Sequence, residues 1–352
     1  MDISHIFFPN LRLEMKLPNS FSVGPLNIHV YGMLIAVGLL LAICYAMVRR
    51  KQFGLTEDDL MDGVLIIVPI AIIFTRAFYC IFAWEEFKDN PIEVFYIWKG
   101  GLAIYGGVIG AVLGILGYCR FKKLKVGAVL DITMLGFLIG QCIGRWGNFF
   151  NMEAFGSYSD GLLAMRIPLE SLMQAMPENP SASYLAQVEV LKQNAIAGGY
   201  EGFVQVHPTF LYESLWNLVG FIALHFLSKK RRYDGQIALG YAAWYGLGRT
   251  WIEGLRMDSL MIGPFRVSQL LAALSCAAAL GILIWQHFRY HDPARLFVNQ
   301  RAAEAAAAEE EEEEEYEEEY EEENGEEAEE AGELEEAEAL PPENTDETGT
   351  EP

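Results

Sequence analysis

Cysteine is scarce in this sequence, with five residues in 352, and no two of them form a Cys-x-x-Cys pair. The sequence therefore predicts neither a disulfide framework nor a zinc site, and we expect no metal or other cofactor. All five lie in apolar runs, where cysteine behaves as a small hydrophobic residue: Cys44, Cys80, Cys119, Cys142 and Cys276. Residues 1–24 lack a basic start followed by an apolar stretch, so no cleavable signal peptide is expected.

Basic residues are also few, with 25 Lys and Arg against 48 Asp and Glu, which gives a formal net charge of −23. The acidity is concentrated in residues 302–352, which hold 26 of the acids and no Lys or Arg. The rest of the chain has 22 acids and 25 bases, so a basic nucleic-acid footprint is absent. We expect residues 289–352 to be a disordered acidic tail, because dense like charges repel and bury no core.

What the sequence does have is 52% hydrophobic residues, gathered in runs of about 20, the length that crosses a bilayer. This predicts an all-α polytopic membrane protein whose transmembrane domain, residues 28–288, has seven spans. The expected spans are residues 28–48, 64–83, 101–119, 126–143, 208–227, 235–252 and 265–287. Residues 1–27 are expected at the outer interface. Residues 150–206 are expected as a small extracytoplasmic insert, with helices at 167–176 and 181–197.

Clusters of basic residues predict the orientation of these spans. They follow the first, third, fifth and seventh spans, at residues 49–51, 120–125, 229–232 and 289–295. Short loops rich in Lys and Arg mark the cytoplasmic side of a membrane. We therefore expect the N-terminus and the insert outside the cell membrane and the C-terminus in the cytoplasm.

The most informative segment is residues 144–156, Gly-Arg-Trp-Gly-Asn-Phe-Phe-Asn-Met-Glu-Ala-Phe-Gly, which we call the signature segment. It follows the fourth apolar run. If the helix persists, Arg145 and Asn148 share one face, since residues three apart are neighbours. An arginine and Glu153 at membrane depth mark a functional site unless they form a structural pair between helices. The glycines allow a neighbouring backbone or a ligand to come close.

A second polar cluster lies at the end of the sixth run. Spacings of four, four and three place Tyr245, Arg249, Glu253 and Arg256 on one helical stripe, which predicts that it faces protein or a polar cavity. Two arginines, Arg145 and Arg249, at one depth form a pocket for an anion, and guanidinium groups bind phosphate bidentately.

Four other polar residues lie in or beside the spans. His207 precedes Pro208 at the mouth of the fifth span, and Glu213 is an acid inside that span, which requires a basic partner. Tyr31 starts the first span, as a candidate interface anchor or site residue. Tyr105 lies between two glycine pairs at the start of the third span, where a ligand contact and simple hydrogen bonding are equally plausible.

Five of these motifs, in this order, resemble prolipoprotein diacylglyceryl transferase, a bacterial inner-membrane enzyme. They are Tyr31-Gly32, the segment Gly100–Gly107, the signature segment, the segment His207–Glu213 and the stripe Tyr245–Arg256. The resemblance implies transfer of the diacylglyceryl group of phosphatidylglycerol to the lipobox cysteine of a prolipoprotein, with release of glycerol phosphate. It thus implies a lipid, a prolipoprotein and the bilayer as partners, and no nucleic acid.

The resemblance also implies roles for single residues. The expected essential polar positions are Arg145, Asn148, Glu153, Arg249 and Glu253. The expected substrate-binding positions add Tyr31, Tyr105, Tyr245, Asn151, His207 and Arg256. Either Glu153 or Glu253 could position an arginine or accept the thiol proton. Many members have histidine where this chain has Tyr105, so a histidine base at that position is not universal. The rival class is a transporter or lipid-binding membrane protein that holds a phosphate headgroup without catalysis.

Overall fold

The computed structural model describes residues 3–23, 26–176, 180–257, 261–262, 265–289 and 292–338. The chain divides into two units, Met1–Val298 and Asn299–Pro352, and the first contains every candidate site residue. Most of the described residues are helical.

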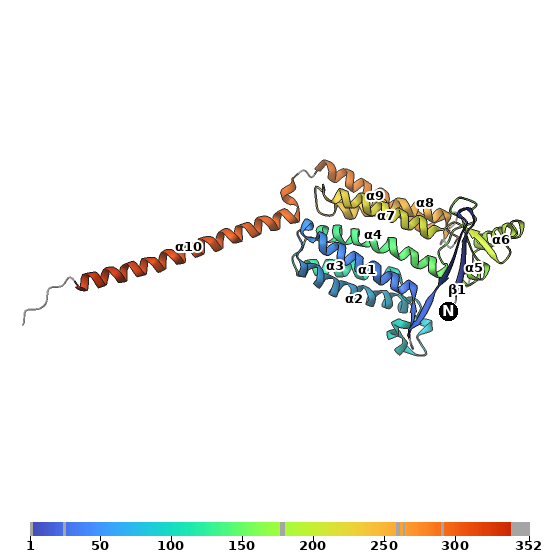
Figure 1. Cartoon of the computed structure of the whole chain (residues 1–352), viewed down its shortest axis with the longest axis horizontal. Helices are drawn as coiled ribbons and strands as arrows, with labels where there is room; N and C mark the ends of the chain where they lie inside the picture. Colours follow the sequence, from blue (N-terminus) through green and yellow to red (C-terminus); the bar gives the residue numbers. More distant parts are fainter. Residues whose placement is uncertain are drawn as a thin grey trace, which may run out of the picture. The chain divides into compact units, whose positions relative to one another are not determined.

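Six helices of the first unit are long and apolar enough to cross a membrane. They are α1 (Val30–Arg49), α2 (Glu57–Phe82), α3 (Ile104–Phe121), α4 (Val126–Asn151), α7 (Thr209–Ser228) and α9 (Val267–Arg289), and they lie side by side (Figure 1). They confirm six of the seven expected spans. The seventh, α8 (Gln236–Ile252), has 17 residues, a rise of about 26 Å against about 30 Å of hydrocarbon. Seven crossings therefore stay a prediction, as does the orientation.

Glycines set the closest helix contacts. A Cβ at Gly110 of α3 would lie 2.6 Å from the Cβ of Phe74 on α2, and one at Gly106 would collide with the same turn. A Cβ at Gly38 of α1 would lie 3.3 Å from the Cα of Gly140 on α4. Small residues let helices approach within a membrane, so α2 pairs with α3 and α1 with α4.

The start of α8 is fixed by a buried carboxylate on α4. Asp131, which is fully buried, accepts hydrogen bonds from the backbone N–H groups of Gly235 and Ala238, each at 2.9 Å. These are unsatisfied donors of the first turn of α8, and Asp131 caps them from a neighbouring helix. Helix α8 therefore begins at the level of Asp131, near the start of α4.

A small domain, which we call the head, covers one end of the helices. It combines the N-terminal segment with the insert between the fourth and fifth spans, two regions that were predicted as separate. Its antiparallel sheet has the order β2-β1-β5-β6, with β1 (Ile3–Phe8), β2 (Leu13–Pro18), β5 (Met165–Pro168) and β6 (Phe203–Val206). Phe7 pairs with Arg166, which joins the N-terminal hairpin to the insert. Helices α5 (Leu169–Gln174) and α6 (Ala182–Ala197) confirm the two helices expected there.

The N-terminal segment, which was expected at the outer interface, folds into strands. Besides β1 and β2 it contains the hairpin β3 (Ser20–Val23) and β4 (Leu26–His29). Ile6, Phe8 and Leu17 are buried in one apolar core with Ile167, Leu191 and other residues of the insert.

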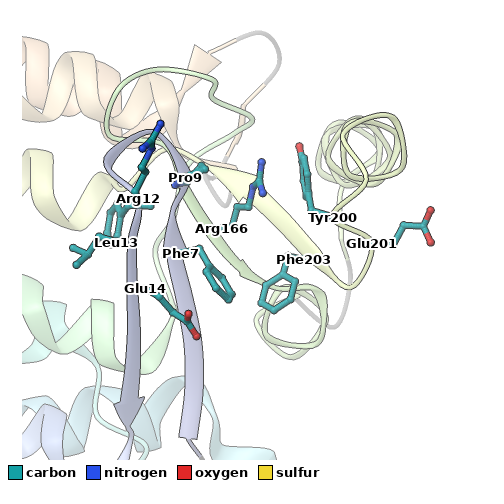
Figure 2. A pocket seen from close by; sticks show the side chains of 10 residues that line it. Phe7, Pro9, Arg12, Leu13, Glu14, Arg166, Tyr200, Glu201 and Phe203 are labelled. Carbon is teal, nitrogen blue, oxygen red and sulfur yellow. The ribbon is translucent and has the colours of Figure 1, made fainter.

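The head also has a pocket between the β1–β2 hairpin and residues 200–203, where the Arg166 guanidinium lies 3.9 Å from the centre of the Tyr200 ring (Figure 2).

The acidic tail contains helix α10 (Phe297–Glu338), where disorder was expected. Alanine and glutamate are strong helix formers, and residues 302–323 consist almost entirely of them. Repulsion between neighbouring glutamates opposes this propensity but does not remove it. Residues 302–317, all of them exposed, contain no large aliphatic side chain, so this stretch of the helix has no apolar face.

Candidate active site

Helix α4 continues through the signature segment to Asn151, so Arg145 and Asn148 share a face as predicted. It ends at Met152 in the left-handed region, with φ of 50°. This tight end turns Glu153 back toward the helix. The Asn148 side-chain amide donates to Glu153 Oε1 at 3.0 Å, and that of Asn151 donates to the same oxygen at 3.4 Å. Arg145 Nη1 lies 3.5 Å from Asn148 Oδ1, so one polar chain runs from Arg145 to Glu153.

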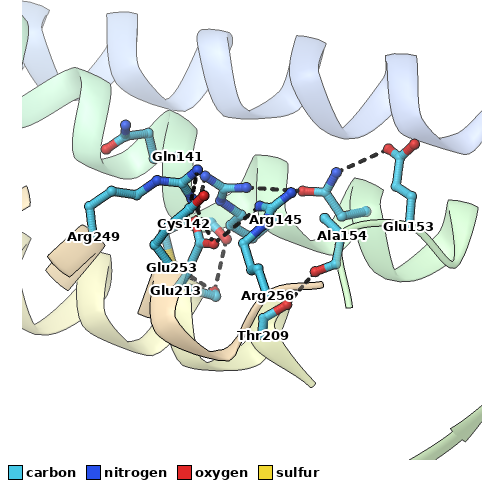
Figure 3. A network of polar contacts seen from close by, with 12 residues as sticks. Gln141, Cys142, Arg145, Glu153, Ala154, Thr209, Glu213, Arg249, Glu253 and Arg256 are labelled. Carbon is cyan, nitrogen blue, oxygen red and sulfur yellow. Dashed lines mark hydrogen bonds and ion pairs between the residues drawn. The ribbon is translucent and has the colours of Figure 1, made fainter. Parts of the chain in front are cut away.

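Glu213 of α7 lies at the centre of the site, where three arginines surround its carboxylate (Figure 3). Glu213 is only 5% exposed to solvent. Glu213 Oε2 lies 2.5 Å from Arg145 Nη2, and Oε1 lies 3.3 Å from Arg249 Nη1 and 3.7 Å from Arg256 Nη1. Arg249 Nη2 is also 2.7 Å from Glu253 Oε2. We call Arg145, Glu213, Arg249, Glu253 and Arg256 the arginine–glutamate cluster.

The cluster corrects one expected pairing and adds one residue. One interpretation of the signature segment was a structural ion pair between Arg145 and Glu153. In the structure Arg145 pairs with Glu213 instead. Glu213 was noted as an acid in need of a basic partner, yet it was not among the candidate site residues. Its location inside an apolar run was the available signal. With three guanidinium groups and two carboxylates, the cluster has one excess positive charge and therefore favours an anion.

Side-chain and backbone contacts bring α4, α7 and α8 together at this point. The Thr209 hydroxyl donates to the Ala154 carbonyl, and the Ser214 hydroxyl donates to the Cys142 carbonyl at 2.8 Å. Gly156, the last residue of the signature segment, donates its N–H to the His207 carbonyl at 3.0 Å. A Cβ at Gly156 would lie 2.7 Å from His207 Cβ and 2.9 Å from the Leu255 carbonyl oxygen, so only glycine fits there.

Two tyrosines border the cluster. Tyr31 of α1 packs over Gly147, where a Cβ would collide with its ring, and it interacts electrostatically with Glu153 and Arg145. Gly147 of the signature segment thus makes room for the side chain of Tyr31. Tyr245 stacks on Tyr241, with ring centroids 5.7 Å apart. The Tyr241 hydroxyl in turn accepts a hydrogen bond from the Gln141 side chain at 3.1 Å, one helical turn before Arg145.

His207 is half-buried at the junction between the head and α7. Burial lowers the pKa of its imidazole, although Asp160 opposes the shift, so the ring is neutral at pH 7. Its Nδ1 lies 3.3 Å from the Tyr212 hydroxyl. The His207 carbonyl, in addition, accepts the N–H of Gly156.

Tyr105 lies apart from the cluster. It lies in the first turn of α3 and is 71% exposed. Arg76, which is buried, fixes the preceding loop by donating to the carbonyls of Gly100 at 2.7 Å and Gly101 at 2.9 Å. Within the described part of the chain, no hydrogen bond or ion pair links Tyr105 to an arginine or glutamate of the cluster.

Comparison with known proteins identifies the family. A family model described as prolipoprotein diacylglyceryl transferase matches residues 18–285. The chain belongs to this transferase family. A phosphatidylglycerol–prolipoprotein diacylglyceryl transferase of Limosilactobacillus reuteri is 40% identical over 271 residues, which cover 76% of this chain and 90% of the relative. Proteins of the same name are 38% identical in Halalkalibacterium halodurans, covering 79% and 92%, and 37% identical in Listeria monocytogenes, covering 78% and 92%.

The family match also separates the chain into parts. It includes every candidate site residue of the prolipoprotein diacylglyceryl transferase pattern, from Tyr31 to Arg256. It ends at residue 285, before the acidic tail. The tail is therefore an addition to the region that this chain shares with the family.

Proposed function

We propose that this protein transfers the diacylglyceryl group of phosphatidylglycerol to the thiol of a prolipoprotein lipobox cysteine. The cysteine thiolate attacks the glycerol carbon that carries the phosphate, a carbon–sulfur bond forms, and the carbon–oxygen bond to phosphate breaks. Glycerol phosphate leaves with the bonding electron pair, and the thiol proton passes to a base. The observation that carries the proposal is the convergence of Arg145, Arg249 and Arg256 on Glu213.

The arginines have a clear electrostatic role in this reaction. The phosphodiester has one negative charge, and the phosphate gains a second as it leaves. Donors that are already in place where charge develops stabilise the transition state, typically by about 10²–10³ in rate for each donor. Arg145 and Arg249 are held by Glu213 before the lipid arrives, so their reorganisation cost during the reaction is low. No metal ion is required for this step.

The geometry favours Glu153 over Glu253 as the acceptor of the thiol proton. Glu253 is buried, and its two oxygens are engaged by the Ser268 hydroxyl at 2.6 Å and by Arg249 at 2.7 Å. Glu153 is exposed beside Asn148 and Asn151. An incoming cysteine can reach an exposed carboxylate without breaking the cluster.

The proposed setting is the bacterial cytoplasmic membrane, crossed by seven helices, with the head and the cluster at the outer face. Helix α8 starts beside Asp131 and ends beside Arg145, so it runs along about 14 residues of α4. This supports α8 as the seventh span despite its length. The basic clusters after α1, α3, α7 and α9 support a cytoplasmic location for the opposite end.

The decisive experiment combines purified protein, vesicles that contain phosphatidylglycerol and a lipobox peptide. We expect a peptide whose mass increases by one diacylglyceryl group, together with released glycerol phosphate. A peptide with serine in place of the cysteine is the matched control and should stay unmodified. Binding of phosphatidylglycerol without any modified peptide would reject the transferase and leave a lipid-binding protein.

A further inference from the structure

Helices α7 and α8 are joined by two tryptophans that hold each other in a reciprocal arrangement. The Trp216 indole N–H donates to the Trp244 carbonyl at 3.0 Å, and the Trp244 indole N–H donates to the Trp216 carbonyl at 2.9 Å. The two rings are stacked, with centroids 4.4 Å apart and planes 18° apart. Each indole, half-buried, thus satisfies its one polar group on the backbone of the other helix.

A glycine lies under each of these rings. Gly248 of α8 lies under Trp216, and Gly220 of α7 lies under Trp244, and a Cβ at either position would collide with the indole nitrogen. Both glycines are buried. Each helix therefore has the pattern Trp-x-x-x-Gly, in which the tryptophan fills the space that the other helix's glycine leaves. We call these four residues the tryptophan pair.

The tryptophan pair permits only one register between the two helices. A shift by one residue moves a helix by about 1.5 Å along its axis and rotates it by about 100°, which would place a side chain where each glycine now lies. Both hydrogen bonds would also break. The register is therefore specified by shape and by polar contacts together, independently of any charge in the site.

This register determines how α8 meets the arginine–glutamate cluster. Glu213 lies three residues before Trp216 on the same face of α7, and Arg249 directly follows Gly248 on α8. The 3.3 Å contact between Arg249 and Glu213 is therefore adjacent to the tryptophan pair. Arg145 reaches Glu213 from α4, so its 2.5 Å contact does not depend on α8.

We propose that the tryptophan pair is a positioning element for catalysis: it sets the α7–α8 register that places Arg249 beside Glu213. The inference rests on the proposed transferase function. Trp216 and Trp244 act through Arg249 and make no contribution to the chemistry themselves. A misplacement of about 1 Å at a catalytic group can cost about 10²-fold in rate, so the pair matters for turnover as well as for folding.

The test is Gly248→Ala, with Gly281→Ala on α9 as the matched control. Among the described residues, nothing lies within 4 Å of a Cβ at position 281. Gly248→Ala should lower kcat about 10²-fold and leave the KM for the lipobox peptide within about twofold. Gly281→Ala should leave both unchanged. Normal kcat for Gly248→Ala would overturn the proposal, whereas an inactive wild type would reject the transferase function itself.

Two further measurements separate positioning from general destabilisation. The stacked indoles should give an exciton-coupled band in the circular dichroism spectrum, which Gly248→Ala removes and Gly281→Ala retains. In an Arg249→Lys background, Gly248→Ala should cost less than about threefold in kcat, because the group it positions is already impaired. The same loss in both backgrounds would show that the tryptophan pair does not act through Arg249.

A milder variant covers the case in which Gly248→Ala fails to fold. Trp244→Phe keeps a smaller aromatic ring over Gly220 and removes the N–H that donates to the Trp216 carbonyl. It should fold and insert, and its kcat should fall at least about fivefold with an unchanged KM. Wild-type turnover in Trp244→Phe would reject a positioning role.

Discussion

Glu213 illustrates how single residues set the character of this site. Its carboxylate is nearly out of contact with solvent, and leaving one member of a buried ion pair unpartnered costs about 3–5 kcal/mol. The three guanidinium groups therefore have to stay near it when no substrate is bound. A phosphate group that enters the cluster meets donors whose directions are already fixed.

The residues that the sequence groups along one helix also lie close together in the structure, and the reason is local. Spacing along one helix placed Arg145 with Asn148 and Arg249 with Glu253, and both pairs are close in the structure. Spacing does not reveal partners on other helices. The contacts of Glu213 come from α4 and α8, and the sequence alone contains no measure of how these helices meet.

The first prediction compares Arg145→Lys with Arg249→Lys. Both variants keep the positive charge and lose the planar fork of donors, so we expect normal folding and a turnover about 10²–10³ lower. The loss should be larger for Arg145→Lys. Both Arg249 terminal nitrogens are engaged by carboxylates, whereas Arg145 contacts one carboxylate and presents more donors to a phosphate.

The measurement is turnover together with thermal stability, and Arg120→Lys is the control. Arg120 is exposed in the last turn of α3, at the end of that helix opposite to Tyr105. Its replacement should therefore change neither turnover nor thermal stability. Near-normal turnover in both site variants would remove the phosphate role. A turnover that falls only in proportion to stability would mean that the arginines merely hold the helices together.

The second prediction concerns Tyr105→Phe. The side chain is largely exposed, and no described cluster residue contacts its hydroxyl. We therefore expect the variant to retain at least about half of the wild-type turnover, as for a residue that packs against or binds lipid. Tyr31→Phe is the comparison, because Tyr31 interacts electrostatically with Arg145 and Glu153 and should be more sensitive. Abolished turnover of Tyr105→Phe with normal lipid binding would instead assign its hydroxyl to proton transfer.

At the scale of elements, helices were easier to predict than strands. Apolar runs and turn residues gave the positions of α1, α2, α3, α4, α7 and α9 within a few residues, except that α2 starts earlier and α4 ends later. The sheet of the head was not predicted from the sequence, because β1 pairs with a strand about 160 residues away. Such a pairing leaves little local signal beyond a short alternation at Ile6 and Phe8.

The tail gives the third prediction, in two truncations. Removal of residues 302–352 should leave turnover within about twofold, because those residues belong to a separate unit and residues 302–317 have no apolar face. Removal from Pro293 onward should be harmful. Leu296 and Phe297 are buried, and the Phe297 N–H donates to Asp234 at 2.8 Å. Burial of two such side chains contributes roughly 3–6 kcal/mol.

Both truncated proteins should be compared at equal membrane abundance, with turnover and unfolding temperature measured for each. A large loss of turnover in the shorter truncation would give the acidic residues a role in the reaction. Equal stability of the two truncations would mean that Leu296 and Phe297 contribute little to packing.

For the whole molecule, the location of the tail depends on whether α8 crosses the membrane. Helix α9 follows α8 directly, so one crossing more or fewer moves everything after α9 to the other side. The ends of α8 are set by Asp131 at one end of α4 and by the arginine–glutamate cluster near the other. A helix tied to both ends of a spanning helix shares its depth, which favours seven crossings and a cytoplasmic tail.

The last prediction tests this topology with single cysteines in a cysteine-free background. A membrane-impermeant thiol reagent added outside should label Glu189→Cys, which is exposed on α6 of the head. It should not label Lys230→Cys, in the basic loop between α7 and α8, or Glu309→Cys in the tail until the membrane is permeabilised. Each variant serves as the accessibility control for the others. Labelling of Glu309→Cys from outside, with Lys230→Cys still protected, would mean that α8 does not cross and that the protein has six spans.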